Sequence, residues 1–560
     1  MGSQNSSGRR RMSDRNAGQR SGAVGDGDSS SAAGGREEDP DLATILSYLI
    51  RSGQVRILPS TGFGADDDDD DEDDDDDYMI SSQTAVVPEA EENPDTNTID
   101  RSEFRQEVLL QSEGCLNYNG ALSKPSIVNM VQRREIGLMN GSKSFTRADC
   151  CVAMSKYLPN HKDTVAQFHS KVFCGTYSQD GDIFLSACQD QNIRIFDTSW
   201  GKFTLMKSVR ARDVGWSVVD TAFSPDGNYL IYSSWSDCIH LCNIHGEHEV
   251  HEALHLFPDA GHSFCAFSIV FSADNKEILA GSNDGGLYVY DRESNQRCLK
   301  ITAHEDDVNS VAFADTSSHI LFSGGDDGLV KVWDRRTLSE ATPVPVGTLA
   351  GHSDGITFID SKNDSRYLLS NSKDQSIKLW DMRKFSSDDA IRGTKRAVAR
   401  QNWDYRWPPV PARVKKVKHV EGDSSLMTYR GHSVLHSLIR ARFSPAYTTG
   451  QRYIYTGCAS GGVVVYDVLT GKVVSRLDGH RGCVRDVSWH PYEHTIISTS
   501  WDGSLGKWTY NGMKNMPHDI DSDSDENASD DDDERCPRRS KRLASLTRRL
   551  DRRRLPVHGI

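Results

Sequence analysis

Two consecutive stretches decide the fold: residues 303–334 read AHEDDVNSVAFADTSSHILFSGGDDGLVKVWD, and residues 351–381 read GHSDGITFIDSKNDSRYLLSNSKDQSIKLWD. In each, a His near the start is followed by a Ser, an Asp and a final Trp-Asp pair. Residues 479–509 keep the same order and end in Trp-Thr. The His-to-Trp distance is 29 residues in the first stretch and 28 in the other two. This repetition indicates an array of similar structural units.

Four further units keep parts of the pattern. Gly261-His262 leads to Tyr290-Asp291, and Gly431-His432 leads to Tyr466-Asp467 with extra turn residues at 447–451. Two earlier units lack the Gly-His pair. The positions that correspond to the Trp of each unit are Phe196, Cys242, Tyr290, Trp333, Trp380, Tyr466 and Trp508.

The repeat resembles the WD40 repeat, in which about 40–45 residues form one four-stranded blade. A single blade cannot cover both of its faces, and stacking blades around an axis buries them. The pattern therefore predicts an all-β, seven-bladed WD40 β-propeller. The His, Ser, Asp and Trp of a unit are expected to form a buried hydrogen-bonded chain, so these histidines are interpreted as structural.

The regions outside the repeats differ in composition. Residues 1–38 and most of 59–144 contain few apolar side chains, and the latter includes the acidic run 66–77, so both are predicted to be mostly disordered. The propeller is assigned to 145–510, and 511–560 to a disordered tail that is acidic and then basic. A strand from before the repeats, at 151–154 or 164–168, is expected to complete the last blade.

Residues 384–427 separate two units by twice the usual distance. Trp403-Asp404-Tyr405-Arg406 imitates the end of a unit, but no alternating strands precede it. The segment is therefore predicted to be a long insertion between strands of one blade, and not an eighth blade. Long loops on rigid scaffolds often carry function.

A short helix and extended segment are predicted at 39–58, between the disordered regions. Asp39-Pro40 forms a good helix start, and Gly53 can end the helix. The apolar stripe of this helix packs either on the propeller or on a partner protein, because so short a helix is marginal alone. The stripe contains Leu42, Ile45, Leu46, Leu49 and Ile50.

Two consecutive units end in W-D-x-R. The boxes are Trp333-Asp334-Arg335-Arg336 and Trp380-Asp381-Met382-Arg383. Each final Arg is expected at the rim of its blade, where a guanidinium can bind carboxylates or carbonyl groups. An ion pair within the blade is the alternative. Two boxes in adjacent blades favour a shared docking surface.

The paired boxes resemble those of WD-repeat substrate receptors of cullin 4–RING ubiquitin ligases. Residues 46–58, 212–218, 402–407 and 498–503 carry a closer match to one member of that family. The resemblance implies that Asp334, Arg336, Asp381 and Arg383 face the triple-propeller adaptor, damaged-DNA-binding protein 1. It also implies that the helix at 42–50 inserts into this adaptor, and that a substrate protein binds elsewhere.

The remaining signals favour no enzyme and no cofactor. The histidines and cysteines between Cys238 and His255 match no closed tetrahedral spacing, so no metal is expected. No Ser/His/Asp or P-loop grouping occurs outside the repeats. The net charge of -16 arises largely from the acidic runs, and direct nucleic-acid binding is not expected. The alternative function is a WD40 scaffold in a nuclear chromatin or RNA assembly.

The location is expected to be nucleus and cytoplasm. Twelve cysteines without a disulfide-like rhythm indicate reduced thiols. The basic stretch 538–542 can act as a nuclear localisation signal. No secretory signal and no membrane-spanning segment are predicted.

Overall fold

A computed structural model describes residues 90–114, 126–136, 144–246, 248, 250–256, 264–401, 403–406, 410–411 and 420–512. The predicted disordered segment 1–38, the predicted helix at 39–58 and most of the tail at 511–560 lie outside these residues. Among the described residues, no helix has both the length and the apolar character needed to cross a bilayer.

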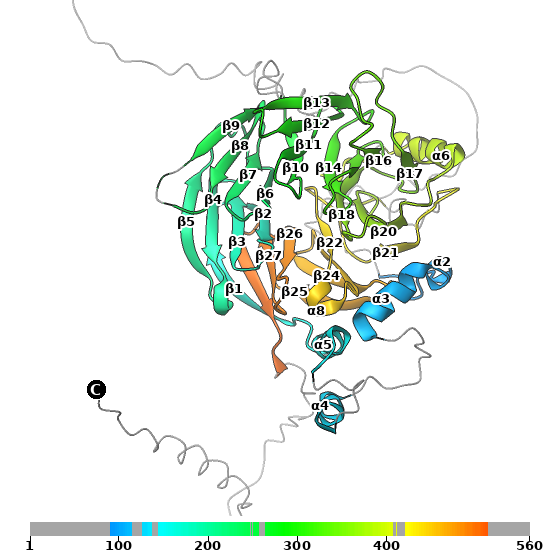
Figure 1. Ribbon diagram of the computed structural model, residues 1–560. Coiled ribbons are helices and arrows are strands. Elements are labelled where there is room, and N and C mark those ends of the chain that lie inside the picture. The colour runs from blue at the N-terminus through cyan, green and yellow to red at the C-terminus, as the bar shows by residue number, and fades with distance from the viewer. Residues whose placement is uncertain are drawn as a thin grey trace, which may run out of the picture. The chain divides into compact units, whose positions relative to one another are not determined.

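Seven antiparallel four-stranded sheets surround a common axis (Figure 1). Neighbouring sheets contact one another in sequence order, and the sheet of β26 contacts that of β2, which closes the ring. The predicted seven-bladed propeller is confirmed. We number the blades I to VII from the sheet that begins at β2.

The strands of blades I to IV follow one another without interruption. Blade I contains β2 (Val172–Tyr177), β3 (Ile183–Cys188), β4 (Asn192–Asp197) and β5 (Thr204–Arg210); blade II contains β6 (Asp220–Phe223), β7 (Tyr229–Ser233), β8 (Cys238–Asn243) and β9 (His251–His255); blade III contains β10 (Ala266–Phe271), β11 (Glu277–Ser282), β12 (Gly286–Asp291) and β13 (Gln296–Thr302); blade IV contains β14 (Val308–Phe313), β15 (Ile320–Gly325), β16 (Val330–Asp334) and β17 (Gly347–Leu349).

The last three blades include the long insertion and the closing strand. Blade V contains β18 (Ile356–Ser361), β19 (Tyr367–Ser372), β20 (Ser376–Asp381) and β21 (Met427–Arg430); blade VI contains β22 (Ala441–Phe443), β23 (Tyr453–Gly457), β24 (Gly462–Asp467) and β25 (Val473–Asp478); blade VII contains β26 (Val484–Trp489), β27 (Ile496–Ser500), β28 (Ser504–Thr509) and β1 (His161–Gln167).

An N-terminal strand completes the last blade, as predicted. β1 pairs antiparallel with β28, and Lys162 lies opposite Trp508. This strand includes most of the second candidate segment, 164–168. The first candidate, 151–154, is wrong as a strand because it belongs to helix α5 (Arg147–Met154). Thr146 and Asp149 form a capping box at the start of that helix.

The insertion lies between β20 and β21 of blade V, as predicted. It contains helix α6 (Asp388–Ala399), whose N-cap Ser387 accepts a hydrogen bond from the Ala390 N–H. Ala390 packs with Leu329 and Ala350, so the insertion reaches blade IV. The extra turn of blade VI contains the short helix α8 (Ala446–Thr449).

Helices also lie within the segment 59–144, which the sequence predicts to be mostly disordered. They are α2 (Asn97–Asp100), α3 (Glu103–Glu113) and α4 (Ile127–Ile136). Ile99, Phe104 and Val108 are completely buried in a core shared with blades V and VI. The expectation of disorder is therefore wrong for 97–113, because these apolar side chains find their partners on the propeller.

The predicted hydrogen-bonded chain is present in the three most regular units. In blade V, the Trp380 indole N–H donates to Ser370 Oγ at 2.7 Å, and Ser370 Oγ lies 2.7 Å from His352 Nε2. His352 Nδ1 lies 2.9 Å from Asp374. Equivalent chains start from His304 and His480. These histidines are satisfied within their blades, as a structural role requires.

Ser370→Ala is expected to lower the free energy of unfolding by about 2–3 kcal/mol, because it leaves the buried Trp380 and His352 nitrogens without their shared partner. Chemical denaturation of the full chain measures this change. Ser339→Ala is the matched control, since Ser339 is exposed. Equal stability of the two variants would contradict a structural role for the chain.

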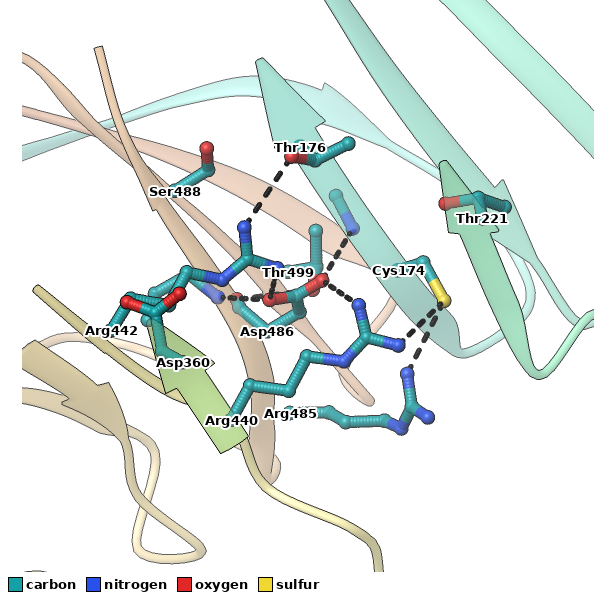
Figure 2. Close-up of polar contacts among 12 residues, drawn as sticks. Cys174, Thr176, Thr221, Asp360, Arg440, Arg442, Arg485, Asp486, Ser488 and Thr499 are labelled. Atoms are coloured by element: carbon teal, nitrogen blue, oxygen red, sulfur yellow. Dashed lines mark hydrogen bonds and ion pairs between the residues drawn. The ribbon is translucent and has the colours of Figure 1, made fainter. Parts of the chain in front are cut away.

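A buried charge cluster joins four blades at the inner strands (Figure 2). Asp486 of blade VII is fully buried and accepts hydrogen bonds from Arg440 and Arg442, both at 3.1 Å. Arg440 also pairs with Asp220 of blade II. Arg485 donates to the carbonyl groups of Phe173 at 2.7 Å and Val219 at 2.9 Å. We name Asp220, Arg440, Arg442, Arg485 and Asp486 the axial cluster.

Candidate docking surface

The two W-D-x-R boxes occupy equivalent places in neighbouring blades. Asp334 ends β16 of blade IV, and Asp381 ends β20 of blade V. Arg336 and Arg383 each follow two residues later, in the turn or insertion that leaves the third strand of the blade. The repeat spacing therefore brings both guanidinium groups to the same end of adjacent blades.

Each Arg is held by the Asp of its own box. Arg336 donates from its backbone N, Nε and Nη2 to Asp334 at 3.0, 3.0 and 2.7 Å. Arg383 donates from the same three atoms to Asp381 at 3.0, 3.0 and 2.8 Å. A fork of this kind fixes the direction of the guanidinium and limits the rotamer entropy that it would lose on binding a partner.

Both guanidinium groups nevertheless remain accessible. The side chains of Arg336 and Arg383 are 62% and 51% exposed, whereas those of Asp334 and Asp381 are 15% and 4% exposed. The ion pair within the blade and the docking role are therefore compatible. The Asp orients the Arg, and the outer guanidinium surface stays open to another molecule.

The carboxylates of the two boxes stay ionised at neutral pH. Hydrogen bonds from Arg336 lower the pKa of Asp334 to about 2. Burial would raise the pKa of Asp381, but the hydrogen bonds from Arg383 outweigh this effect and lower it. Each box is thus a carboxylate–guanidinium pair throughout the physiological pH range.

The neighbouring Arg335 has a different partner. It donates from Nε and Nη2 to Glu277 of blade III, at 3.1 and 2.7 Å. This ion pair joins two blades and leaves Arg336 as the outward-facing Arg of the first box. Two other units have an Asp at the same place but no Arg two residues later. Asp291 accepts hydrogen bonds from the backbone N–H of Glu293 and the hydroxyl of Ser294, and Asp467 pairs with Arg452.

The same fork also occurs among the described residues of the insertion. Arg406 donates from its backbone N, Nε and Nη2 to Asp404 at 3.0, 2.9 and 2.6 Å. This pair does not follow a strand of any blade. The fork is therefore a local property of the D-x-R sequence, and its place at the end of a third strand distinguishes the two boxes.

Helix α3 lies beside the second box, a feature that the sequence analysis missed. Glu103 at the start of α3 pairs with Arg366 and lies 3.5 Å from Arg383 Nη1. Glu107 pairs with Arg366 at 2.6 Å. The Phe104 ring lies 4.7 Å from the Tyr367 ring. The candidate surface is thus asymmetric, with Arg336 open and Arg383 shared with a helix.

A signal for α3 was available in the sequence. Phe104, Val108 and Leu109 recur at spacings that place them on one side of a helix, and Gly114 has the left-handed conformation of a C-terminal cap. The surrounding polar residues concealed this pattern.

The five apolar residues predicted to contact the adaptor, Leu42, Ile45, Leu46, Leu49 and Ile50, lie outside the described residues. They stay a prediction.

Comparisons with known proteins agree with this architecture. The WD domain, G-beta repeat family matches residues 161–197, 254–291, 295–334, 343–381 and 471–509. The two long unmatched stretches between these residues, 198–253 and 382–470, include the unit with Cys242 in place of the Trp and the unit that follows the long insertion.

Several relatives are similar over most of the propeller. The chain is 45% identical to a DDB1- and CUL4-associated factor 11 homolog of Caenorhabditis elegans, over 64% of each chain. It therefore spans less than two thirds of that relative's length. It is 43% identical to the homolog of Caenorhabditis briggsae, over 68% of this chain and 70% of the relative. It is also 43% identical to the LEC14B protein of Lithospermum erythrorhizon, over 70% of this chain and 84% of the relative.

The two Caenorhabditis relatives carry the name of the member, factor 11, that the sequence stretches resemble most closely. The chain belongs to the WD-repeat family that contains the DDB1- and CUL4-associated factor 11 homologs and the LEC14B proteins.

Proposed function

We propose that this protein is the substrate-recognition subunit of a cullin 4–RING ubiquitin ligase. It would bind the adaptor, damaged-DNA-binding protein 1, through one surface and a substrate protein through another. The names of two relatives refer to association with DDB1 and CUL4, which supports this assignment. The subunit itself would be non-catalytic, because ubiquitin is transferred by a conjugating enzyme bound elsewhere in the ligase.

One observation carries the proposal. Arg336 and Arg383 are oriented by buried or half-buried carboxylates, yet more than half of each side chain is exposed. Arg is enriched at the energetic centres of protein interfaces, and a side chain that is already oriented loses less entropy on binding. Two of them at equivalent positions of adjacent blades suit a single partner that offers carboxylates or carbonyl groups.

The proposal is tested by mixing purified full-length chain with purified adaptor and measuring the mass of the complex by size-exclusion chromatography with light scattering. A complex of one chain with one adaptor is expected. Two separate species at micromolar concentrations would refute the proposal. The alternative, a nuclear scaffold, instead predicts that deletion of residues 513–560 removes the main interaction and that substitutions in the boxes have no effect.

We also propose that the protein is present in both nucleus and cytoplasm, because the basic stretch 538–542 suits a nuclear localisation signal. Microscopy of cells that express the intact chain and a chain with these basic residues replaced tests this. A nuclear fraction that does not change would exclude this stretch as the signal.

A further inference from the structure

Blade II lacks the hydrogen-bonded chain of the regular blades. Cys242 stands in the place of the Trp, and no Gly-His pair precedes the blade. A different group of polar side chains lies in this blade. His240 on β8 is 2% exposed, and Cys238 on the same strand is 4% exposed. The WD40 repeat pattern does not account for a buried His and a buried Cys, both of which can bind a metal, on this strand.

Three potential metal ligands converge at this place. His240 Nε2 lies 3.0 Å from Asp213 Oδ2 and 3.8 Å from Cys238 Sγ. The three ligand atoms all lie within 4.8 Å of one another. Zinc–ligand bonds of about 2.0–2.3 Å in a tetrahedron place neighbouring ligand atoms roughly 3–4 Å apart. The observed separations are close to that requirement without any movement of the backbone.

Two more potential ligands lie near the same sulfur. Asp237, Cys238 and His255 form a second triad, and His255 Nδ1 lies 3.7 Å from Asp237 Oδ2. Because Cys238 belongs to both triads, Asp237 and His255 are the candidates for a fourth ligand.

The backbone around the cluster is shaped to bring these groups together. Asp213 has a φ of 50°, an uncommon conformation for a residue other than glycine. Two residues later, a Cβ on Gly215 would lie 2.9 Å from both the Cβ and the carbonyl oxygen of Trp235. Only glycine lets this loop approach the turn before Cys238 so closely. The loop belongs to the stretch 212–218, which the propeller repeat does not explain.

Supporting side chains fix the imidazole. The Tyr232 ring stacks on His240, with ring centroids 5.0 Å apart and an angle of 9° between the planes. Tyr232 Oη also lies 2.7 Å from His251 Nε2. The stacked Tyr232 ring limits rotation of the His240 ring and so holds the imidazole in one orientation.

The charges favour a cation. Two carboxylates, Asp213 and Asp237, flank the thiol of Cys238. Each has an oxygen within 4.8 Å of Cys238 Sγ, so both place negative charge beside the sulfur.

We propose that Asp213, Cys238 and His240 bind one Zn²⁺ ion, with Asp237 or His255 as the fourth ligand. One sulfur, one imidazole and one carboxylate form a donor set suited to zinc. Binding would replace the S–H bond of Cys238 with a zinc–sulfur bond and release one proton to solvent. The metal would join the loop at 212–218 to β8 and so substitute for the missing hydrogen-bonded chain of blade II.

Sequence spacing alone could not find this site. The closely spaced residues from Cys238 to His255 form no standard zinc pattern, which led to the expectation of no metal. Asp213 lies before the blade in sequence, and only the fold brings it beside Cys238.

The test uses Co²⁺ as a spectroscopic probe on full-length chain treated with a chelator. One Co²⁺ per chain is expected, with a thiolate-to-cobalt charge-transfer band in the near ultraviolet that Zn²⁺ removes by competition. Cys238→Ser should abolish the band. Cys298→Ser is the matched control, because Cys298 is an exposed cysteine of blade III and should leave the band unchanged.

A second variant guards against loss of folding in Cys238→Ser. The Asp213 side chain is 65% exposed, so Asp213→Asn leaves the core intact and should weaken Co²⁺ binding at least about tenfold. Absence of a charge-transfer band in the wild-type chain, or an identical band in Cys238→Ser, would overturn the proposal. Unchanged affinity in Asp213→Asn would remove Asp213 from the ligand set and overturn the triad as proposed.

Discussion

Reversal of both outward charges, in the variant R336E/R383E, is expected to lower the affinity for purified adaptor by at least about a hundredfold. Loss of one desolvated charged partner at an interface typically costs about 2–5 kcal/mol, and a reversed charge adds repulsion from the acidic groups it would face. Biolayer interferometry of the full-length variant against immobilised adaptor measures the change. The single variants should each show a smaller loss.

A matched control exists in the same chain. Arg406→Glu breaks an identical Asp–Arg fork, at Asp404, that does not follow a blade strand. Arg406→Glu should destabilise the turn at 404–406 as much as either box substitution destabilises its own turn, while leaving adaptor binding unchanged. Wild-type affinity in R336E/R383E, or an equal loss in Arg406→Glu, would show that the boxes are not the contact.

The second large effect concerns stability. Asp486→Asn is expected to lower the free energy of unfolding by about 3–5 kcal/mol, because the buried guanidinium of Arg440 and the partly buried one of Arg442 lose their shared carboxylate. The substitution keeps the size of the side chain, so lost charge accounts for the effect. Chemical denaturation followed by tryptophan fluorescence measures it, with exposed Asp478→Asn as the control.

The same substitution should show a defined pH dependence. Burial would raise the pKa of Asp486, but Arg442 and Arg440 outweigh it and lower the pKa below the unfolded value of about 4. The stabilisation is therefore present above pH 4 and is lost as pH falls through the folded-state pKa. The gap between wild type and Asp486→Asn should narrow in acid. A gap that stays constant with pH would assign the loss to packing instead of charge.

The propeller could be predicted from sequence because its signal is repeated. Three units carry the same hydrogen-bonded chain at nearly fixed spacing and the others keep parts of its pattern, so one unit such as 351–381 helps to identify the others. The same regularity exposed the insertion at 384–427 and the positions of Arg336 and Arg383. The sequence also offered two candidates for the closing strand, because the last unit lacks a fourth strand of its own.

The repeated sequence pattern could not predict contacts between segments that are distant in the sequence. Helix α3 is polar in composition, and its few apolar residues become meaningful only against blades V and VI. The axial cluster joins Asp220 to Arg440 across the ring, and Asp213 reaches Cys238 across a loop. None of these pairs repeats along the chain, so only the three-dimensional arrangement reveals them.

Hydrogen–deuterium exchange of the full-length chain, with and without adaptor, tests the central claim most directly. Adaptor should slow exchange in the segments that contain Arg336 and Arg383, at the ends of β16 and β20, and leave the opposite ends of these strands unaffected. Protection confined to those opposite ends, with unchanged exchange around both arginines, would contradict docking through this rim.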